Sequence, residues 1–398
     1  MDTAVLRERF PALRNSRGIY FDNAATSLVP DDVLGEVARY SREFSVNAGR
    51  GAYSLATKLT VEIDEARERI ADFIGVEPCE IVFTANTTDA INKLALSLKY
   101  KPRKSIAVTH LEHHSNLLPW RLVSERNDIP LQLIRYTPQG IIDVNHAEKT
   151  LRRNCQLIAF TAASNVLGTV QPVKELTNLA HEKGVLVVVD AAQWAGHFAM
   201  NLKDWDCDFC AFSAHKMCGP TGTGILYVRK EVQKQLSPIF LGGGTVGDVT
   251  DEVMKLKDFP YCFEPGTLNI EGIFGFAAAV KFLSEVGMDD IEKRVSGLHR
   301  HLLGGLSEIE GVITYTPKDV DNAGITSFCI KGLTPHRTAS IFDRKGKLML
   351  RSGYHCAVPL VKSLGNGKGT VRASLAFYNT AEEVERFLEI TDEIVKEL

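Results

Sequence analysis

Short apolar runs recur along the first two thirds of the chain, with helical patterns between them. Runs of three to five consecutive apolar residues are typical of strands that are buried on both faces of a sheet. Strands that alternate with helices favour an α/β fold in which a mainly parallel sheet is covered by helices on both faces. The runs are Ile81-Val82-Phe83, Ser105 to Val108, Leu157 to Phe160, Val185 to Val189 and Gly224 to Val228.

The alternation lapses near Gly242-Gly243-Gly244 and the charged run from Asp248 to Asp258, which marks a candidate domain boundary. We therefore expect a large domain over residues 19–255 and a smaller α+β domain built from residues 1–18 and 256–398. The sequence predicts a helix over 60–74, a strand over 325–330 and an amphipathic closing helix over 381–398. Residues 1–18 are weakly patterned and fit one helix.

The charge balance argues against nucleic-acid and membrane partners. The 398 residues include 46 basic and 49 acidic side chains, a net charge of -3, which provides neither a basic field nor a polybasic anchor. No stretch approaches 18 consecutive apolar residues, and we expect a soluble cytoplasmic protein. Eight cysteines are too sparse for a disulfide framework. Cys207 and Cys210 form a CxxC pair, for which packing in a strand is favoured over zinc binding.

Polar residues that follow the apolar runs are candidates for a site, because ligands of parallel sheets bind beyond the carboxyl ends of the strands. Thr87 and Thr88 follow the first run and open a helix, where hydroxyl groups either cap the helix or help to bind phosphate. His113 follows the second run, in a segment that fits a surface loop, a metal site or a ring stacked on a planar cofactor.

Asp190 ends the run Val187-Val188-Val189, and Gln193 lies one turn further on. A lone aspartate at a strand end is more often a helix cap or an ion-pair partner. Lys216 changes this balance, since a lysine amine with a lowered pKa can form a Schiff base, while Ser213 and His215 beside it can donate to a phosphate. Together these residues indicate a pocket for pyridoxal phosphate, whose ring nitrogen a carboxylate keeps protonated.

Several segments, in this order along the chain, resemble the motifs of class V, fold-type I pyridoxal-phosphate enzymes. The segments at 351–357 and 372–380 resemble more narrowly the group II, SufS-type cysteine desulfurases. The resemblance implies a seven-stranded, mainly parallel sheet in the large domain and covers about residues 20–380. The motifs are Phe21-Asp22-Asn23-Ala24-Ala25, Asn86 to Asn92, Glu112 to Asn116, Ser164 to Gly168, Asp190 to Gln193, Ser213 to Lys216, Phe263 to Thr267, Arg351 to Ala357 and Arg372 to Thr380.

The resemblance implies a role for each matching residue. Lys216 would hold the cofactor and move the Cα proton, His113 would stack on the ring, Asp190 would pair with the ring nitrogen, and Gln193 would contact the phenolic oxygen. Phosphate ligands would be Thr87, Thr88, Ser213 and His215, with Thr267 reaching in from the second subunit of a homodimer. Asn165, Arg351 and Arg372 would bind the substrate, Arg372 as a bidentate clamp on its carboxylate.

Cys356 would distinguish the reaction from those of related enzymes. The implied activity is conversion of L-cysteine to L-alanine with a persulfide on Cys356, whose sulfur passes to a SufE- or SufU-like acceptor for iron–sulfur cluster assembly. A thiolate is the nucleophile, and His355 or Arg351 could lower the cysteine pKa. The alternatives are a selenocysteine lyase, another class V lyase or aminotransferase, and a scaffold that has lost its chemistry.

Two segments depart from the family pattern. Gly49-Arg50-Gly51-Ala52-Tyr53 stands where the family often has His-Arg-Gly-x-His, and Tyr354-His355-Cys356 stands where His-His-Cys is common. Tyr53 and Tyr354 therefore replace imidazoles near the expected entrance and near the nucleophile. These changes affect persulfide handling or acceptor choice rather than the cofactor set.

Overall fold

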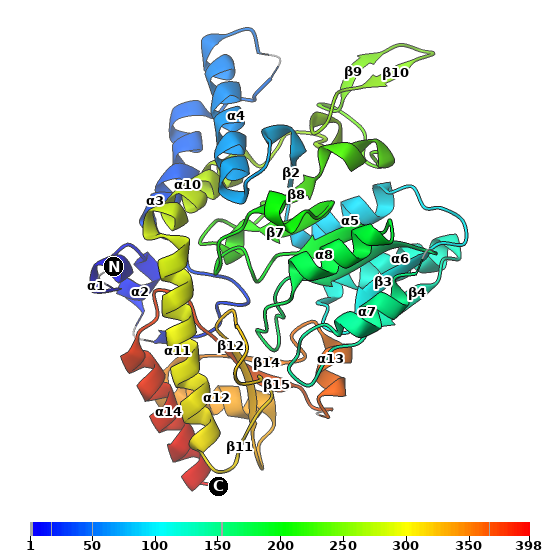
Figure 1. Cartoon of the computed structure of the whole chain (residues 1–398). Coiled ribbons are helices and arrows are strands. Elements are labelled where there is room, and N and C mark those ends of the chain that lie inside the picture. The colour runs from blue at the N-terminus through cyan, green and yellow to red at the C-terminus, as the bar shows by residue number, and fades with distance from the viewer. Residues whose placement is uncertain (1–2, 17, 50, 153, 366) are drawn as a thin grey trace.

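A seven-stranded sheet forms the centre of the larger region of this computed structural model (Figure 1), which describes residues 3–16, 18–49, 51–152, 154–365 and 367–398. Arg50 lies outside the described residues. The strand order is β2-β8-β7-β6-β5-β3-β4, and β8 runs antiparallel to both of its neighbours while the other pairs are parallel. The predicted mainly parallel sheet is therefore confirmed. Its strands are β2 (Ile81–Thr84), β3 (Ser105–Thr109), β4 (Leu131–Ile134), β5 (Cys155–Thr161), β6 (Leu186–Asp190), β7 (Phe209–Ser213) and β8 (Gly224–Val228).

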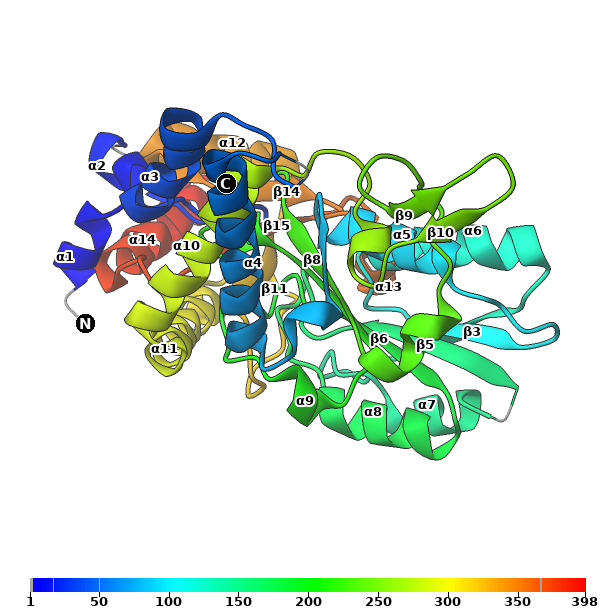
Figure 2. The same ribbon diagram turned by 90° about the horizontal axis from the view of Figure 1, so that it is seen from above.

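Helices cover both faces of this sheet. Successive strand residues point to opposite sides, and because the residues on both sides are apolar, each face is buried by helices. In β6, Val187 and Val189 pack in one apolar core, whereas Val188 packs in the other. The first core includes residues of α4 (Ser54–Ile74), α8 (Val173–Glu182) and α10 (Ile270–Val286). The second includes residues of α5 (Thr87–Ser97) and α6 (Leu118–Asn127). Figure 2 shows α5 and α6 on the side of the sheet opposite to α8. The remaining elements of this region are α3 (Asp31–Arg39), α7 (Val144–Thr150) and α9 (Leu202–Trp205).

The smaller region contains a four-stranded antiparallel sheet in the order β11-β12-β15-β14. The predicted strand at 325–330 is β12, and the predicted closing helix is α14. Cys356 lies in the loop between β14 and α13. These elements are β11 (Val312–Thr314), β12 (Ile325–Ile330), β13 (Leu348–Met349), β14 (Arg351–Gly353), β15 (Thr370–Ser374), α11 (Met288–Glu308), α12 (Pro335–Gly346), α13 (Val358–Ser363) and α14 (Ala381–Lys396).

The amino-terminal segment forms two short helices, α1 (Thr3–Glu8) and α2 (Pro11–Asn15), rather than the single helix that we expected. Pro11 opens the second helix, where its missing N–H costs nothing, and it cannot continue the first. The predicted helix at 60–74 is α4, which begins six residues earlier, at Ser54. Strand β1 (Ile19–Tyr20) then enters the body of the protein and pairs with β13.

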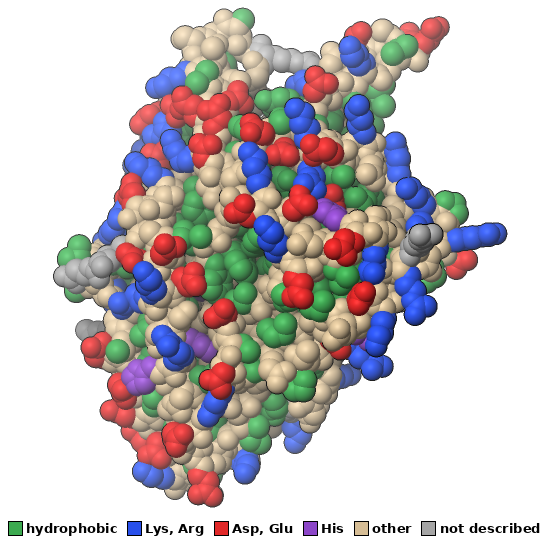
Figure 3. Space-filling view, in the orientation of Figure 1, with side chains coloured by type: hydrophobic (Ala, Val, Ile, Leu, Met, Phe, Trp, Pro, Cys, Tyr) green, Lys and Arg blue, Asp and Glu red, His purple; other side chains and the backbone are tan. Residues whose placement is uncertain are grey.

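The segment near the predicted boundary forms a two-stranded antiparallel hairpin of β9 (Val246–Val249) and β10 (Met254–Leu256), which projects from the top of the molecule in Figure 1. Helix α10, which follows it, packs against α3 and α4. Figure 3 shows acidic and basic side chains interspersed over the visible face. In the described part of the chain, no helix has the length and apolar character needed to cross a membrane.

Candidate active site

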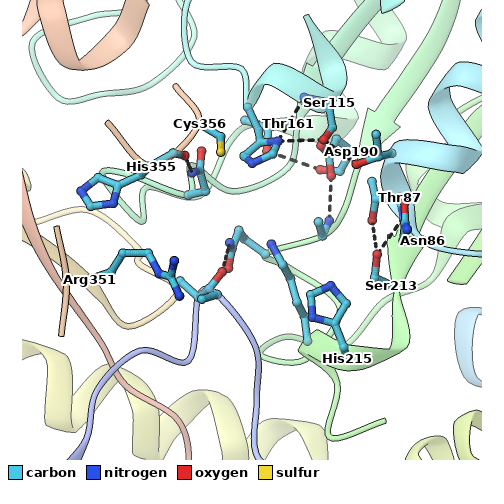
Figure 4. A pocket seen from close by; sticks show the side chains of 18 of the residues that line it. Asn86, Thr87, Ser115, Thr161, Asp190, Ser213, His215, Arg351, His355 and Cys356 are labelled. Carbon is cyan, nitrogen blue, oxygen red and sulfur yellow. Dashed lines mark hydrogen bonds between the residues drawn. The ribbon is translucent and has the colours of Figure 1, made fainter. Parts of the chain in front are cut away.

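A cavity of about 670 Å³ lies between the carboxyl edge of the seven-stranded sheet and the smaller sheet (Figure 4). It brings together every residue predicted for the site except Thr267. The strand-end rule pointed to the part of this lining that includes Thr87, His113 and Asp190, whereas Asn165, Arg351, Cys356 and Arg372 were expected only from the resemblance. The predicted residues that line it are Thr87, Thr88, His113, Asn165, Asp190, Gln193, Ser213, His215, Lys216, Arg351, Cys356 and Arg372.

Lys216 lies in a tight turn directly after β7, and Asp190 is the last residue of β6. Burial of the Lys216 amine lowers its pKa to about 8, while the Asp190 charge acts in the opposite direction. Asp190 is 3% exposed, its carboxylate accepts a hydrogen bond from the Ala192 N–H at 2.9 Å, and burial raises its pKa. Gly196 passes so close that a Cβ atom there would lie 2.3 Å from the Lys216 carbonyl oxygen. The site therefore combines a lysine amine that is easily deprotonated with a buried carboxylate.

Hydroxyl groups gather at the amino terminus of α5. Ser213 Oγ accepts a hydrogen bond from the Thr87 N–H and lies 2.7 Å from Thr87 Oγ1, while Thr88 Oγ1 lies 2.7 Å from Ser115 Oγ. Burial lowers the pKa of His215 to about 4, so its ring is neutral and can donate a hydrogen bond. The amino terminus of an 11-residue helix, where the helix dipole is positive, forms with the four hydroxyls around it a site suited to a phosphate.

His113 projects into the cavity from the loop after β3, and its ring is neutral. Burial, with a further contribution from Lys216, lowers its pKa to about 3. The Ser115 N–H donates to His113 Nδ1 at 3.1 Å, so the proton of the neutral ring lies on Nε2. A neutral, half-buried imidazole with a fixed tautomer fits the predicted stacking role. Gln193 also lines the cavity, and its Nε2 donates to the Ala24 carbonyl at 2.9 Å.

Two arginines of the smaller sheet face Asp22. Arg351 donates to both Asp22 oxygens at 2.7 to 3.1 Å, and Arg372 Nη2 lies 3.6 Å from Asp22 Oδ1. Arg372 Nη1 donates to the Asn165 carbonyl at 2.8 Å. Among the described residues, the buried Arg372 Nε and Asn165 Oδ1 have no hydrogen-bond partner. Burial lowers the Arg372 pKa to about 10, which still leaves it protonated at neutral pH. This unsatisfied donor and acceptor fit the carboxylate and a polar hydrogen of an amino acid.

Cys356 is an exposed free thiol in the loop between β14 and α13, and Figure 4 shows its sulfur toward the cavity. The expectation that His355 could lower the thiol pKa is wrong. The His355 ring is buried, its Nε2 lies 2.9 Å from Thr370 Oγ1, and burial lowers its pKa to about 3, so it carries no positive charge. The alternative expectation, that Arg351 acts on the thiol, stays a prediction, and Arg351 lines the same cavity as Cys356.

Thr267 lies outside this cavity and lines a separate one of about 420 Å³. The predicted role of Thr267 is to bind the phosphate in the site of a second subunit, and that role stays a prediction. Of the two tyrosines that replace histidines, Tyr53 is 50% exposed just before α4, and Tyr354 donates through its hydroxyl to the Gly367 carbonyl at 2.6 Å.

Sequence reasoning assigned no role to several residues of the site: Asp22, Asn86, Ser115 and Thr161. Asn86 caps α5 through the Asp89 N–H at 2.9 Å. Thr161 ends β5 and lines the cavity, so the strand-end rule that selected Asp190 also selects it. Asp22 and Ser115 belong to two of the segments that resemble family motifs, but nothing in the sequence spacing indicates that Asp22 pairs with Arg351 or that Ser115 contacts Thr88.

Comparison with known proteins gives full-length matches. A family model described as Aminotransferase class-V matches residues 19–387. A probable cysteine desulfurase of Methanothermobacter thermautotrophicus is 40% identical over 99% of this chain and 98% of its own length, and one of Pyrococcus abyssi is 42% identical over 96% and 95%. The apo structure of a cysteine desulfurase from Thermococcus onnurineus NA1 superimposes with a TM-score of 0.95 at 41% identity and covers 99% of this chain and 98% of that one.

Proposed function

The chain belongs to the class-V aminotransferases and, within them, to the pyridoxal-phosphate-dependent cysteine desulfurases, and on this premise we propose that it converts L-cysteine to L-alanine with a persulfide on Cys356. The observation that carries the proposal is the exposed Cys356 thiol in the same cavity as Lys216, Asp190 and Arg372. An aminotransferase has no need of a nucleophilic cysteine at that position.

The residues of the cavity fit pyridoxal phosphate. The hydroxyls and the positive end of the helix dipole at the start of α5 suit its phosphate, and the neutral His113 ring suits its aromatic face. Asp190, a buried carboxylate with a raised pKa, suits a protonated ring nitrogen, and Lys216 suits the aldehyde. When bound, the cofactor supplies an electron sink for the Cα carbanion of the substrate.

The residues of this chain then bind the substrate, move its Cα proton and attack its sulfur. Arg372 binds the substrate carboxylate, Asn165 Oδ1 accepts a polar hydrogen of the substrate, and Lys216, whose pKa burial lowers to about 8, removes and returns the Cα proton. The Cys356 thiolate attacks the substrate sulfur, so an S–S bond forms as the substrate Cβ–S bond breaks. The electron pair of the Cβ–S bond stays with carbon, which takes a proton to give alanine. L-cysteine and one enzyme thiol thus balance L-alanine and one enzyme persulfide, and no external oxidant is needed.

We further propose a SufS-type role, in which a homodimer in the cytoplasm passes the persulfide sulfur to a SufE- or SufU-like acceptor for iron–sulfur cluster assembly. The resemblance of the segments 351–357 and 372–380 to that group supports the acceptor, as does the exposure of Cys356. The apolar tip of the β9–β10 hairpin supports the dimer, since Val249, Val253 and Met254 are 54–60% exposed. Sedimentation of the purified protein tests the dimer, and sulfide release with and without candidate acceptors tests the acceptor.

The experiment that tests the activity follows alanine formation and the mass of the Cys356 peptide after addition of L-cysteine. We expect wild type to form alanine and to gain one sulfur atom on Cys356. Cys356→Ser should keep the visible absorbance of the bound cofactor but form neither product, and Lys216→Ala should lose that absorbance. Alanine formation from cysteine by Cys356→Ser at the wild-type rate contradicts the persulfide mechanism. Selenocysteine in a parallel assay tests the lyase alternative.

A further inference from the structure

The loop that carries Cys356 has an unusual backbone. His355 and Cys356 have φ angles of +50° and +54°, two consecutive residues with side chains in the left-handed region. Such conformations are sparsely populated by residues other than glycine, and they persist only where surrounding contacts hold them. The position of the nucleophile therefore depends on what holds this loop.

His114 contacts the loop at the nucleophile and at the residue two positions after it. Its backbone N–H donates to the Cys356 carbonyl at 2.7 Å, and its ring Nε2 accepts from the Val358 N–H at 3.3 Å, at the start of α13. Asn165 adds a third contact, because its Nδ2 donates to the His355 carbonyl at 2.7 Å. His114 follows His113 directly in sequence, so one short segment reaches both the cavity and the nucleophile loop.

The segment that carries His114 is itself anchored by a buried carboxylate. Glu112 is 1% exposed and accepts hydrogen bonds from the Thr161 N–H at 3.1 Å, from Asn116 Nδ2 at 2.6 Å and from the Thr109 hydroxyl. These bonds tie the segment to the carboxyl ends of β3 and β5. His114 therefore contacts the loop from a part of the chain that the central sheet holds in place.

The contacts of His114 also argue against a role as the base that deprotonates Cys356. Because Nε2 accepts from the Val358 N–H, the proton of the neutral ring lies on Nδ1, and Nε2 is not free to take a thiol proton. Burial lowers the pKa of His114, which keeps the ring neutral at neutral pH. The geometry therefore fits a structural contact with the loop better than proton transfer.

We propose that His114 is a positioning residue for Cys356, which holds the strained loop through its backbone hydrogen bond to the Cys356 carbonyl and the hydrogen bond that its ring accepts from the Val358 N–H. The inference rests on the proposed function and identifies how the thiol is kept at the cavity. Loss of the ring contact should misplace the sulfur relative to the substrate, while the residues that hold the cofactor stay as they are.

The test compares His114→Ala, His114→Gln and the control His336→Ala as holoenzymes. His336 is an exposed histidine on α12. Glutamine can accept the Val358 N–H through its amide oxygen but cannot act as a base at neutral pH. Three readouts are taken: the rate of alanine formation, the change in cofactor absorbance on adding cysteine, and hydrogen–deuterium exchange in the peptide that contains Val358.

We expect His114→Ala to form alanine about 10- to 100-fold more slowly and to exchange faster in the Val358 peptide, with the absorbance change retained. His114→Gln should recover most of the rate and of the protection, and His336→Ala should match wild type. If alanine does not yield folded protein, asparagine replaces it, because its side chain is too short to reach Val358.

The inference is overturned if His114→Ala forms alanine and exchanges deuterium as wild type does. It is also overturned if His114→Gln is as slow as His114→Ala although its Val358 N–H is protected, because that result indicates proton transfer by His114. Failure of the proposed function is a separate result. A wild-type protein that forms no alanine refutes the activity, whereas the exchange measurement still shows whether His114 holds the loop.

Discussion

We expect the Lys216 amine of the cofactor-free protein to titrate near pH 8. Burial lowers its pKa from the ordinary 10.5 to about 8, the nearby Arg372 lowers it further, and the Asp190 charge opposes both. At pH 7 roughly a tenth of the Lys216 amines are then unprotonated, against roughly three in ten thousand for an ordinary lysine. The protein should therefore present about 300-fold more free amine at this position than at an unperturbed lysine.

Two charge deletions should move this pKa in opposite directions. Asp190→Asn removes the charge that raises it, so the midpoint should fall below that of wild type. Arg372→Met removes a charge that lowers it, so the midpoint should rise. Because the folded pKa lies below the unfolded one, the protonated lysine destabilises the fold below about pH 8, and stability should increase with pH between about 8 and 10.5.

Competitive acetylation of the cofactor-free protein across a pH series measures the titration. Mass spectrometry compares the extent of labelling at Lys216 with that at Lys174, an exposed lysine on α8 that serves as the internal reference. The reasoning is refuted if Lys216 titrates together with Lys174, or if Asp190→Asn raises its midpoint. A shift in both variants in the same direction also contradicts the assignment of the two charges.

Two further changes test other parts of the structure. Glu264→Ala removes the two 2.8 Å hydrogen bonds that the buried Arg67 guanidinium donates to this carboxylate, while its bond to the Ile81 carbonyl stays, and should cost about 3–5 kcal/mol of stability in urea unfolding. Arg386→Ala on the exposed face of α14 should cost little, and equal unfolding midpoints for the two variants contradict this. Arg372→Lys should raise KM for cysteine roughly 10- to 100-fold, because it loses a charged, forked contact to the substrate carboxylate; an unchanged KM shows that the carboxylate binds elsewhere.

The strands of the large domain were predictable because their signal is local. Four of the predicted runs lie within strands of the sheet, and the fifth, Val185 to Val189, begins one residue before β6. The polar residues that follow these runs line one cavity. Strand β4 was missed because it is an edge strand whose residues Leu131 and Gln132 are only partly buried, so no continuous apolar run marks it. The start of α4 was missed because Leu55, Ala56 and Leu59 precede the window in which the helical period is clear.

The substrate-binding half of the site was not predictable from local pattern. Arg372 lies in the middle of a fully buried strand, where a charged residue contradicts the pattern that identifies the strand, and only resemblance indicated its role. Its position depends on Asp22, which is 350 residues distant in sequence. The contact between His114 and the Cys356 loop is similar, because it joins segments about 240 residues apart in sequence through groups that no spacing identifies.

The segment from Asp22 to Ser27 explains how residues from both regions stay in register. At one end the Asn23 Nδ2 donates to the Ser374 carbonyl at 2.7 Å and the Ala24 N–H donates to Ser374 Oγ at 2.9 Å, next to the strand that carries Arg372. At the other end the Ser27 N–H and hydroxyl donate to the His215 carbonyl at 2.8 and 3.0 Å, next to Lys216. A stretch of six residues thus connects the arginine strand to the lysine turn by direct hydrogen bonds. This segment therefore links Arg372 and Lys216 through a short series of hydrogen bonds between parts of the chain that are distant in sequence.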